Sequence, residues 1–421
     1  MTTSAVSFAA WVGLDWADRK HDVCLKPVGG ACEFAQIEHR PEAIEAWAYA
    51  LRDRFAGQPI AVCLEQRKGA LIYALLKYQF LVLFPVNPQT LCRFRRAFKT
   101  SRAKDDPSDA AWMVELLERH PDKLTAWQPD TAAVRQLRLL VEMRRTAVAE
   151  RVRISNRLSA ALKCYFPQVL DWFEDRATPM VCDFLIRWPD LESVQRAKRA
   201  TLARFFHAHN SRYAQVIARR LQAIAQAQPL TTDAAVIVPY RLLVQALVQQ
   251  LAISLRAVEQ FDRAIAQCFS QIPDANFFSS LPGAGPQLAP RLLAAMGSQR
   301  DYWPSATGLL QYAGIAPVTE RSGNQSWVHW RYNCPKFLRQ TFVEWAGQST
   351  LHSFWAKAFY QQQRAKGKPH AVAIRALAFK WIRILHRCWL DRIPYDESRY
   401  LMALQKKGSP LLAGLVTAQN P

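Results

Sequence analysis

Four carboxylates stand at places where a folded chain can gather them into one site. Asp15 and Glu65 each end a short apolar segment typical of a buried strand, and Asp106 and Asp109 lie one helical turn apart. A helix start explains the second pair alone, because Asp106 is a good N-cap and Asp109 faces the positive end of the helix dipole. If all four lie at one edge of a sheet, they form an acidic cluster.

Such a cluster is tolerated only when divalent cations neutralise it, since carboxylates at close range repel one another. Mg²⁺ suits a site made of oxygen ligands alone, with Mn²⁺ as an alternative. Two such ions can activate an attacking oxygen and stabilise a leaving oxygen in the displacement of a phosphodiester. The sequence therefore favours a catalytic metal site at Asp15, Glu65, Asp106 and Asp109 over four separate surface carboxylates.

The overall charge indicates a polyanionic partner. The chain has 55 Lys and Arg against 34 Asp and Glu, a formal net charge of +21, and nucleic acid is the commonest partner of such a chain. The sequence has no secretory signal and no apolar run of eighteen or more residues, which argues against a membrane protein. Nine cysteines without a C-x-x-C pair predict reduced thiols in a cytosolic protein rather than zinc ligands or disulfides.

Two basic segments are candidate nucleic-acid surfaces. Residues 91–104 contain no acid, and residues 357–389 combine eight Lys and Arg with aromatic residues that include Phe359, Trp381 and Trp389. A solvated face explains each segment alone, but cations with interleaved aromatics fit phosphate neutralisation and base stacking better. The predicted nucleic-acid contacts are Arg93, Arg95, Arg96, Lys99, Arg102, Lys104, Lys336, Arg339, Lys380 and Arg383.

The elements that must position the carboxylates occupy residues 1–125. Here strand and helix patterns follow the order β-β-β-α-β-α-β-α, which predicts a mixed sheet with helices on its faces. That order matches the RNase H-like fold without excluding other α/β folds. The predicted strands are 9–17, 20–28, 32–39, 59–65 and 80–87, and the predicted helices are 41–55, 69–78 and 107–120.

The rest of the chain is predicted to be mostly helical, so the fold class is α/β plus all-α. Within the middle region, residues 126–275, the segment 240–269 carries a heptad-like apolar stripe. This stripe predicts a helical hairpin or an intermolecular coiled coil, with an ordinary bundle helix as an equal alternative. Residues 276–395 form a third domain, which begins with two short helices around a PGAG turn, and residues 396–421 form a tail.

Taken together, these motifs resemble the DEDD transposases, the insertion-sequence recombinases with a RuvC-like N-terminal domain that are guided by a bridge RNA. The resemblance rests on Asp15, Glu65 and the K-x-D-x-x-D-A pattern that begins at Lys104. Downstream, the stretches LPGAGPQLAPRLLAAMG, LLQYAGIAP and RSG follow in the order of the family's C-terminal transposase domain. The resemblance covers about residues 9–120 and 277–390.

The resemblance implies a mechanism and a set of partners. The four acids would bind Mg²⁺, and Ser322, which by itself is an ordinary turn serine, would attack a DNA phosphate to form a transient covalent link. Donor and target DNA would both pair with a noncoding bridge RNA encoded by the element. The protein would act as homodimers that assemble into tetramers, in the bacterial cytoplasm at the nucleoid.

Two other function classes stay open. A metal-dependent nuclease or resolvase of the Holliday-junction type would use the four acids with water as the nucleophile, and Ser322 would then be dispensable. A non-catalytic nucleic-acid-binding protein on an RNase H-like scaffold would need neither the acids nor the serine.

Overall fold

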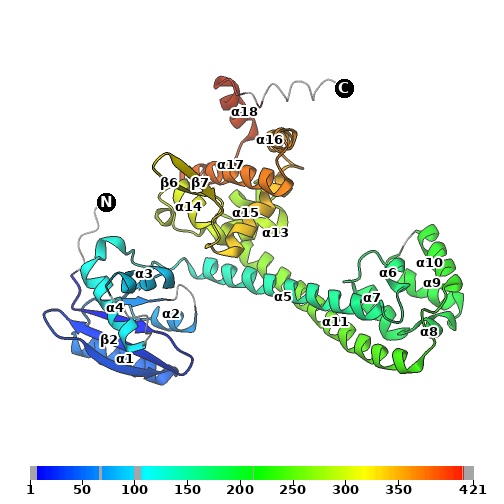
Figure 1. Cartoon of the computed structure of the whole chain (residues 1–421), viewed down its shortest axis with the longest axis horizontal. Coiled ribbons are helices and arrows are strands. Elements are labelled where there is room, and N and C mark those ends of the chain that lie inside the picture. Colours follow the sequence, from blue (N-terminus) through cyan, green and yellow to red (C-terminus); the bar gives the residue numbers. More distant parts are fainter. Residues whose placement is uncertain (1–6, 66–68, 99–105, 212, 410, 412–421) are drawn as a thin grey trace. The chain divides into compact units, whose positions relative to one another are not determined.

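The computed structural model describes residues 7–65, 69–98, 106–211, 213–409 and 411 (Figure 1). Two compact units make up the chain, Met1–Pro129 and Asp130–Pro421. The predicted contacts Lys99, Arg102 and Lys104, and the side chain of Asp106, lie outside the described residues.

The first unit is a five-stranded mixed sheet with helices, as the strand and helix patterns predict. Its strand order is β3-β2-β1-β4-β5, with β1 antiparallel to β2 and parallel to β4. The segment after residue 87 forms one further helix, α3, which is not among the helices predicted above. The elements are β1 (Ala10–Asp15), β2 (Lys20–Pro27), β3 (Glu33–Glu38), α1 (Pro41–Arg54), β4 (Ile60–Leu64), α2 (Ala70–Leu75), β5 (Leu81–Pro85), α3 (Pro88–Phe98), α4 (Asp106–Arg119) and η1 (Pro121–Lys123).

Alternation along the strands gives the sheet two buried faces. Even-numbered residues of β1 and β4, such as Leu14 and Leu64, join one apolar core with residues of α1 and α2. Odd-numbered residues of β4, such as Cys63, join a second core with Met113 and other residues of α4. Helix α4 therefore covers the odd-numbered face of the central strands.

Gly13 allows α4 to lie against β1. A Cβ atom at this position would lie 1.9 Å from the carbonyl oxygen of Ala110 and 3.0 Å from the Cβ of Met113. Any larger residue would overlap the helix backbone, so the glycine sets how closely the first turns of α4 approach the end of β1.

The second unit is built on a long antiparallel helical hairpin. Helices α5 (Ala132–Leu162) and α11 (Ala234–Ser270) run side by side, and five short helices pack at one end of the pair (Figure 1). The predicted apolar stripe is buried at Leu247, Leu251 and Val258, so these residues pack within the helical hairpin of the chain itself. The short helices are α6 (Val169–Trp172), α7 (Pro179–Arg187), α8 (Leu191–Gln195), α9 (Arg199–Ala208) and α10 (Ala214–Gln226).

Helix α11 is also the one helix of the described chain that is long and apolar enough to cross a membrane. That criterion uses length and composition alone, and a core helix of a protein without membrane spans also meets it. The helix packs along α5, and 22% of its most apolar window is buried by the rest of the chain.

The other end of the hairpin joins a helical core. Trp345, Trp355, Trp381 and Trp389 are fully buried in it, and Phe359 is nearly so. The predicted stacking of bases on Phe359, Trp381 and Trp389 is therefore wrong, because these rings form the core. The elements are α12 (Ala275–Ser279), α13 (Gly285–Met296), η2 (Arg300–Tyr302), α14 (Ala306–Tyr312), β6 (Val318–Ser322), β7 (Gln325–His329), α15 (Lys336–Ser349), α16 (Phe354–Ala365), α17 (His370–Asp391) and α18 (Glu397–Lys406).

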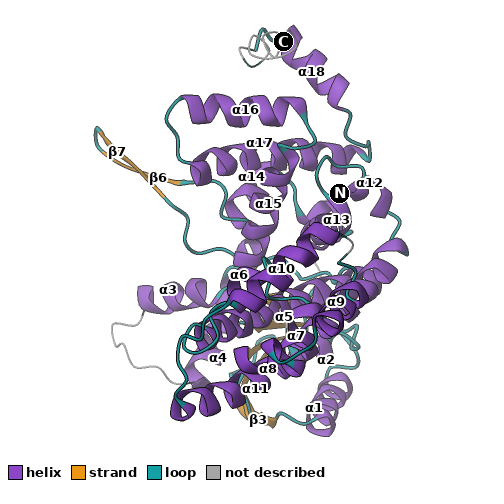
Figure 2. Ribbon diagram, turned by 90° about the vertical axis from the view of Figure 1, so that its right-hand side faces the viewer, coloured by secondary structure: helices purple, strands orange, loops and turns teal. Residues whose placement is uncertain are grey.

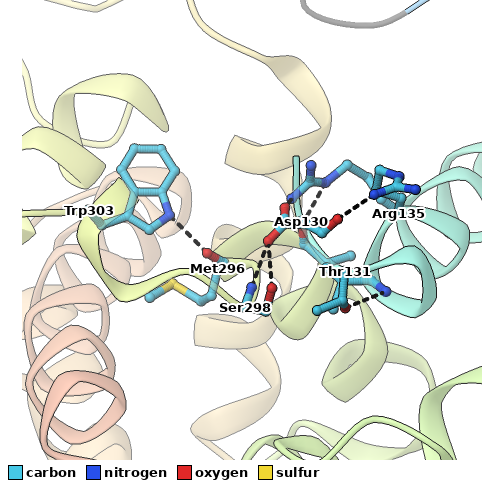
Figure 3. A network of polar contacts seen from close by, with 9 residues as sticks. Asp130, Thr131, Arg135, Met296, Ser298 and Trp303 are labelled. Carbon is cyan, nitrogen blue, oxygen red and sulfur yellow. Dashed lines mark hydrogen bonds and ion pairs between the residues drawn. The ribbon is translucent and has the colours of Figure 1, made fainter. Parts of the chain in front are cut away.

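A polar network fixes the start of α5 to this core (Figure 3). Oδ1 of Asp130 accepts hydrogen bonds from the backbone N–H of Ser298 at 2.8 Å and from its hydroxyl at 3.0 Å. Oδ2 of the same carboxylate pairs with Arg138 at 2.7 Å. Nearby, the indole of Trp303 donates to the carbonyl of Met296 at 3.1 Å. Because the carboxylate of Asp130 is largely buried and is bonded through both oxygens, it ties the start of α5 to the segment that follows α13.

Candidate active site

The ends of β1 and β4 bring two of the predicted acids to one edge of the sheet. These strands are parallel neighbours in the register Leu14–Leu64, so Asp15 and Glu65 come next on adjacent strands. Neighbouring strands lie about 4.8 Å apart. Asp15 shares the odd-numbered face with Gly13, which is the face that α4 covers. Both acids are half-buried.

Asp109 reaches this edge from above. It lies in the first turn of α4, directly before Ala110, whose carbonyl packs on Gly13. Its side chain is only 8% exposed and forms an ion pair with Arg95 of α3, which is 14% exposed. Arg95, predicted as a nucleic-acid contact, thus neutralises a buried carboxylate of the acidic site. The sequence alone does not predict this ion pair, because the two residues come from different helices.

The described side chains at this edge do not by themselves form a complete site for a divalent cation. Within the described part of the chain, no three His, Cys, Asp or Glu side chains are close enough together to hold a metal ion. The side chain of Asp106 is outside that part, and the carboxylate of Asp109 is turned to Arg95. The donor set at this edge is nevertheless made of carboxylates, which suit Mg²⁺ rather than zinc.

A buried histidine shapes the segment that follows Asp15. Nδ1 of His21 accepts a hydrogen bond from the backbone N–H of Ala17 at 3.3 Å, and Nε2 lies 3.0 Å from Nδ1 of His39. His21 therefore carries its proton on Nε2 and donates it to His39. Burial, and then the neighbouring His39, lower the pKa of His21 from its usual value, so the folded protein favours the neutral ring.

Ser322 lies at the end of an exposed β-hairpin in the second unit. It is the last residue of β6 and pairs with Gln325 of β7 across a turn in which Gly323 has a φ of +56°. Every residue of the hairpin except Val318 is exposed, and the hairpin projects from the helices of its unit (Figure 2). The sequence predicts a turn here, and the structure adds the two strands that flank it. The flanking segments around Ser-Gly-Asn carry the missed hairpin signal.

The other predicted nucleic-acid contacts lie on α3, α15 and α17 and differ in their exposure. Arg93 and Arg96 are exposed on α3, and Lys336 is exposed at the start of α15. Lys380 and Arg383 lie on α17, where burial, and then Arg383, lower the pKa of Lys380. Arg339 is the remaining one and is half-buried on α15.

Comparison with known proteins gives consistent matches along the chain. Residues 12–167 match the DEDD transposase family of the IS110 type, and residues 275–361 match the transposase IS116/IS110/IS902 family. A protein of Streptomyces coelicolor, named as a candidate transposase of the IS117 mini-circle, is 27% identical over 93% of this chain and 97% of its own length. An uncharacterized 44.8 kDa protein of insertion element IS116 from Streptomyces clavuligerus is 27% identical over 91% of this chain and 95% of its own length.

Proposed function

We propose that this chain is a DEDD transposase of the IS110/IS116 family and that it inserts and excises its own insertion sequence through a covalent serine–DNA intermediate. The observation that carries this proposal is the approach of Asp15, Glu65 and the first turn of α4 to one sheet edge. The strand order of the sheet supports an RNase H-like catalytic domain over residues 1–125. The helical middle region, 126–275, and the transposase domain, 276–395, would then present the serine.

In this proposal Asp15, Glu65, Asp106 and Asp109 hold Mg²⁺. When bound, the ions would supply charge stabilisation for the displaced and attacking oxygens of a phosphodiester. The protein's own part is to hold these acids at one edge of the sheet, with the packing of Gly13 against Ala110 keeping α4 in place. Before Mg²⁺ binds, the ion pair with Arg95 offsets the charge of Asp109, which reduces the repulsion among the acids at this edge.

Ser322 would be the nucleophile. Its Oγ attacks a DNA phosphorus, the bond from that phosphorus to the leaving deoxyribose oxygen breaks, and the serine proton passes to solvent while the leaving oxygen gains one. The reverse reaction with another strand's hydroxyl rejoins the DNA, so the energy of the phosphodiester is retained. The exposed position of Ser322 at the end of a projecting hairpin supports this role, since a DNA backbone can reach it.

The partners follow from the charge and from the family. Transposases act on DNA, and the net charge of +21 suits donor DNA, target DNA and a noncoding bridge RNA that selects both. We also propose homodimers that assemble into tetramers, acting in the cytoplasm at the nucleoid. Recovery of one element-encoded RNA with the purified protein would support the guide, and recombination by protein freed of RNA would contradict it.

A strand-cleavage assay tests the acidic site. Asp15→Asn and Glu65→Gln should each lower the rate of cleavage of element-end DNA at least about a thousandfold, because several kcal/mol of transition-state stabilisation are lost. Asp22→Asn is the matched control, since Asp22 is the register partner of Asp15 on β2 and bonds Gln36. Equal rates for Asp15→Asn and Asp22→Asn would remove the acidic edge from the mechanism.

The acidic edge also supports a second function, a nuclease that uses water as the nucleophile. The two functions differ at Ser322, because a water-using nuclease retains cleavage in Ser322→Ala. In the serine mechanism the same variant retains DNA binding and loses cleavage.

A further inference from the structure

A cluster of three arginines lies at the base of the Ser322 hairpin. Trp330, the residue after β7, is 40% exposed, and the guanidinium groups of Arg339 from α15 and Arg375 from α17 both lie over its ring. The third arginine, Arg331, donates from Nε to the carbonyl of Ala316 at 3.4 Å. Arg339 in turn donates to the carbonyl of Arg331 at 3.5 Å.

These positive charges lack a counter-charge among the described residues. None of the carboxylates in the described ranges forms an ion pair with Arg331, Arg339 or Arg375. The Nε of Arg375 is buried and has no hydrogen-bond partner within the same ranges. An indole face attracts a cation but does not neutralise it, so the cluster keeps a net positive charge.

Arg375 is the most strained of the three electrostatically. Burial, and then the neighbouring Arg339, lower its pKa to about 10, which is unusual for a guanidinium. A partly buried cation without a counter-ion costs stability, and a bound anion would remove that cost. Guanidinium groups match the oxygens of a phosphate in a forked geometry, and phosphate is the anion that a DNA-processing protein meets.

The position of the cluster separates it from the bond that is cut. The hairpin register runs from Val318–His329 at the base to Ser322–Gln325 at the tip. Four residues of strand span about 14 Å, so a phosphate at the base is not the one next to Ser322. The ring of Trp330 holds the guanidinium groups of Arg339 and Arg375 next to the base of the hairpin.

We propose that Arg331, Arg339 and Arg375 bind a backbone phosphate of the DNA strand that is cut, at a position flanking the cleavage site, and that this contact holds the strand along the hairpin. The proposal rests on the proposed function, since it takes Ser322 as the end that meets the scissile phosphate. Arg375 is a positioning residue here, because it acts on the strand and not on the reacting atoms.

The test measures DNA binding rather than cleavage, with full-length protein carrying the RNA that it retains on purification. Element-end DNA is prepared with single phosphates replaced, one at a time, by neutral methylphosphonate. When the methylphosphonate replaces one particular flanking phosphate, wild-type and Ser322→Ala protein should both bind the DNA about tenfold more weakly than unmodified DNA. Arg375→Gln protein should bind unmodified DNA about tenfold more weakly than wild-type protein does. In Arg375→Gln the sensitive position should lose its effect, because the contact is already absent.

A matched control removes a positive charge elsewhere. Arg263→Gln deletes an exposed guanidinium on α11 that pairs with Glu259. Its DNA affinity should stay within about twofold of wild type, and its salt dependence should not change, whereas Arg375→Gln should lower the salt slope by about one. Thermal unfolding of both variants shows whether a loss of affinity comes from a loss of folding. Arg339→Gln, as a second variant in the cluster, should weaken DNA binding in the same way.

Three results would overturn the assignment. Unchanged affinity in a folded Arg375→Gln protein would show that no phosphate is bound there, and so would a sensitive phosphate that persists in that variant. Loss of retained RNA with unchanged DNA affinity would show that the cluster serves RNA. The outcome for the serine is separate: if Ser322→Ala still cuts DNA while the flanking contact is present, the proposed nucleophile fails and the phosphate site stands.

Discussion

Replacement of Gly13 by alanine should damage both stability and catalysis, because only hydrogen fits between β1 and α4. The new Cβ would lie 1.9 Å from the carbonyl oxygen and 2.8 Å from the carbonyl carbon of Ala110. Real Cβ contacts are not shorter than 3.0 Å, so α4 must retreat by about 1 Å. The atoms it meets belong to the helix backbone, so no rotamer change can relieve the overlap. Overpacking of this kind costs about 3 kcal/mol.

Calorimetry and a cleavage assay together measure the effect of Gly13→Ala. The unfolding transition of the first unit should fall by roughly 10 °C. Cleavage should slow about a hundredfold, since a shift of about 1 Å at Asp109 disturbs the acidic edge. Gly347→Ala is the matched control: Gly347 lies inside α15 with nothing within 4 Å of a new Cβ, and the variant should be more stable by about 0.5–1 kcal/mol. If Gly13→Ala has the same unfolding temperature and the same cleavage rate as the wild type, the close packing of α4 on β1 is refuted.

Two further predictions concern buried charge in the first unit. Arg95→Gln leaves the buried carboxylate of Asp109 without its counter-charge and should destabilise this unit by about 3 kcal/mol. Added Mg²⁺ should restore part of this loss of stability. Urea unfolding with and without the ion measures both effects, and equal stability of the variant and the wild type would contradict the prediction. The lowered pKa of His21 means that the folded state favours the neutral ring, so its contribution is complete above the unfolded pKa of about 6.5 and is lost as the pH falls below that value. The free energy of unfolding should therefore change less between pH 7.5 and pH 5.5 in His21→Gln than in the wild type. One titrating group can account for at most about 1.4 kcal/mol of this change per pH unit. Identical pH dependence in the variant and the wild type would disprove the role of His21.

The sequence predicted the first unit well because its strands carry strong local patterns. Apolar runs bounded by Gly, Pro and charged residues placed the five strands within a few residues of their observed ends. Strand order then placed Asp15 and Glu65 on neighbouring strands. The ion pair of Arg95 with Asp109 could not be predicted, since it depends on how α3 and α4 pack and not on any spacing within one element.

The second unit was harder to predict because composition does not say which side of a helix faces the core. Trp381 and Trp389 were interpreted as surfaces for bases, yet they repeat every four residues with Leu377 and Leu385 along α17, and all four are fully buried. The hairpin of Ser322 was missed for the opposite reason: its strands are short and exposed, so they lack the apolar alternation that marks a core strand.

The most direct test of the central claim is to look for a covalent protein–DNA adduct. Wild-type protein, Ser322→Ala and Asp15→Ala would be incubated with element-end DNA and Mg²⁺, then denatured and resolved by mass. We predict a protein–DNA adduct for the wild type that maps to Ser322 and is absent from both variants. Cleaved DNA without an adduct, produced equally well by Ser322→Ala, would contradict the serine mechanism and leave a nuclease that uses water.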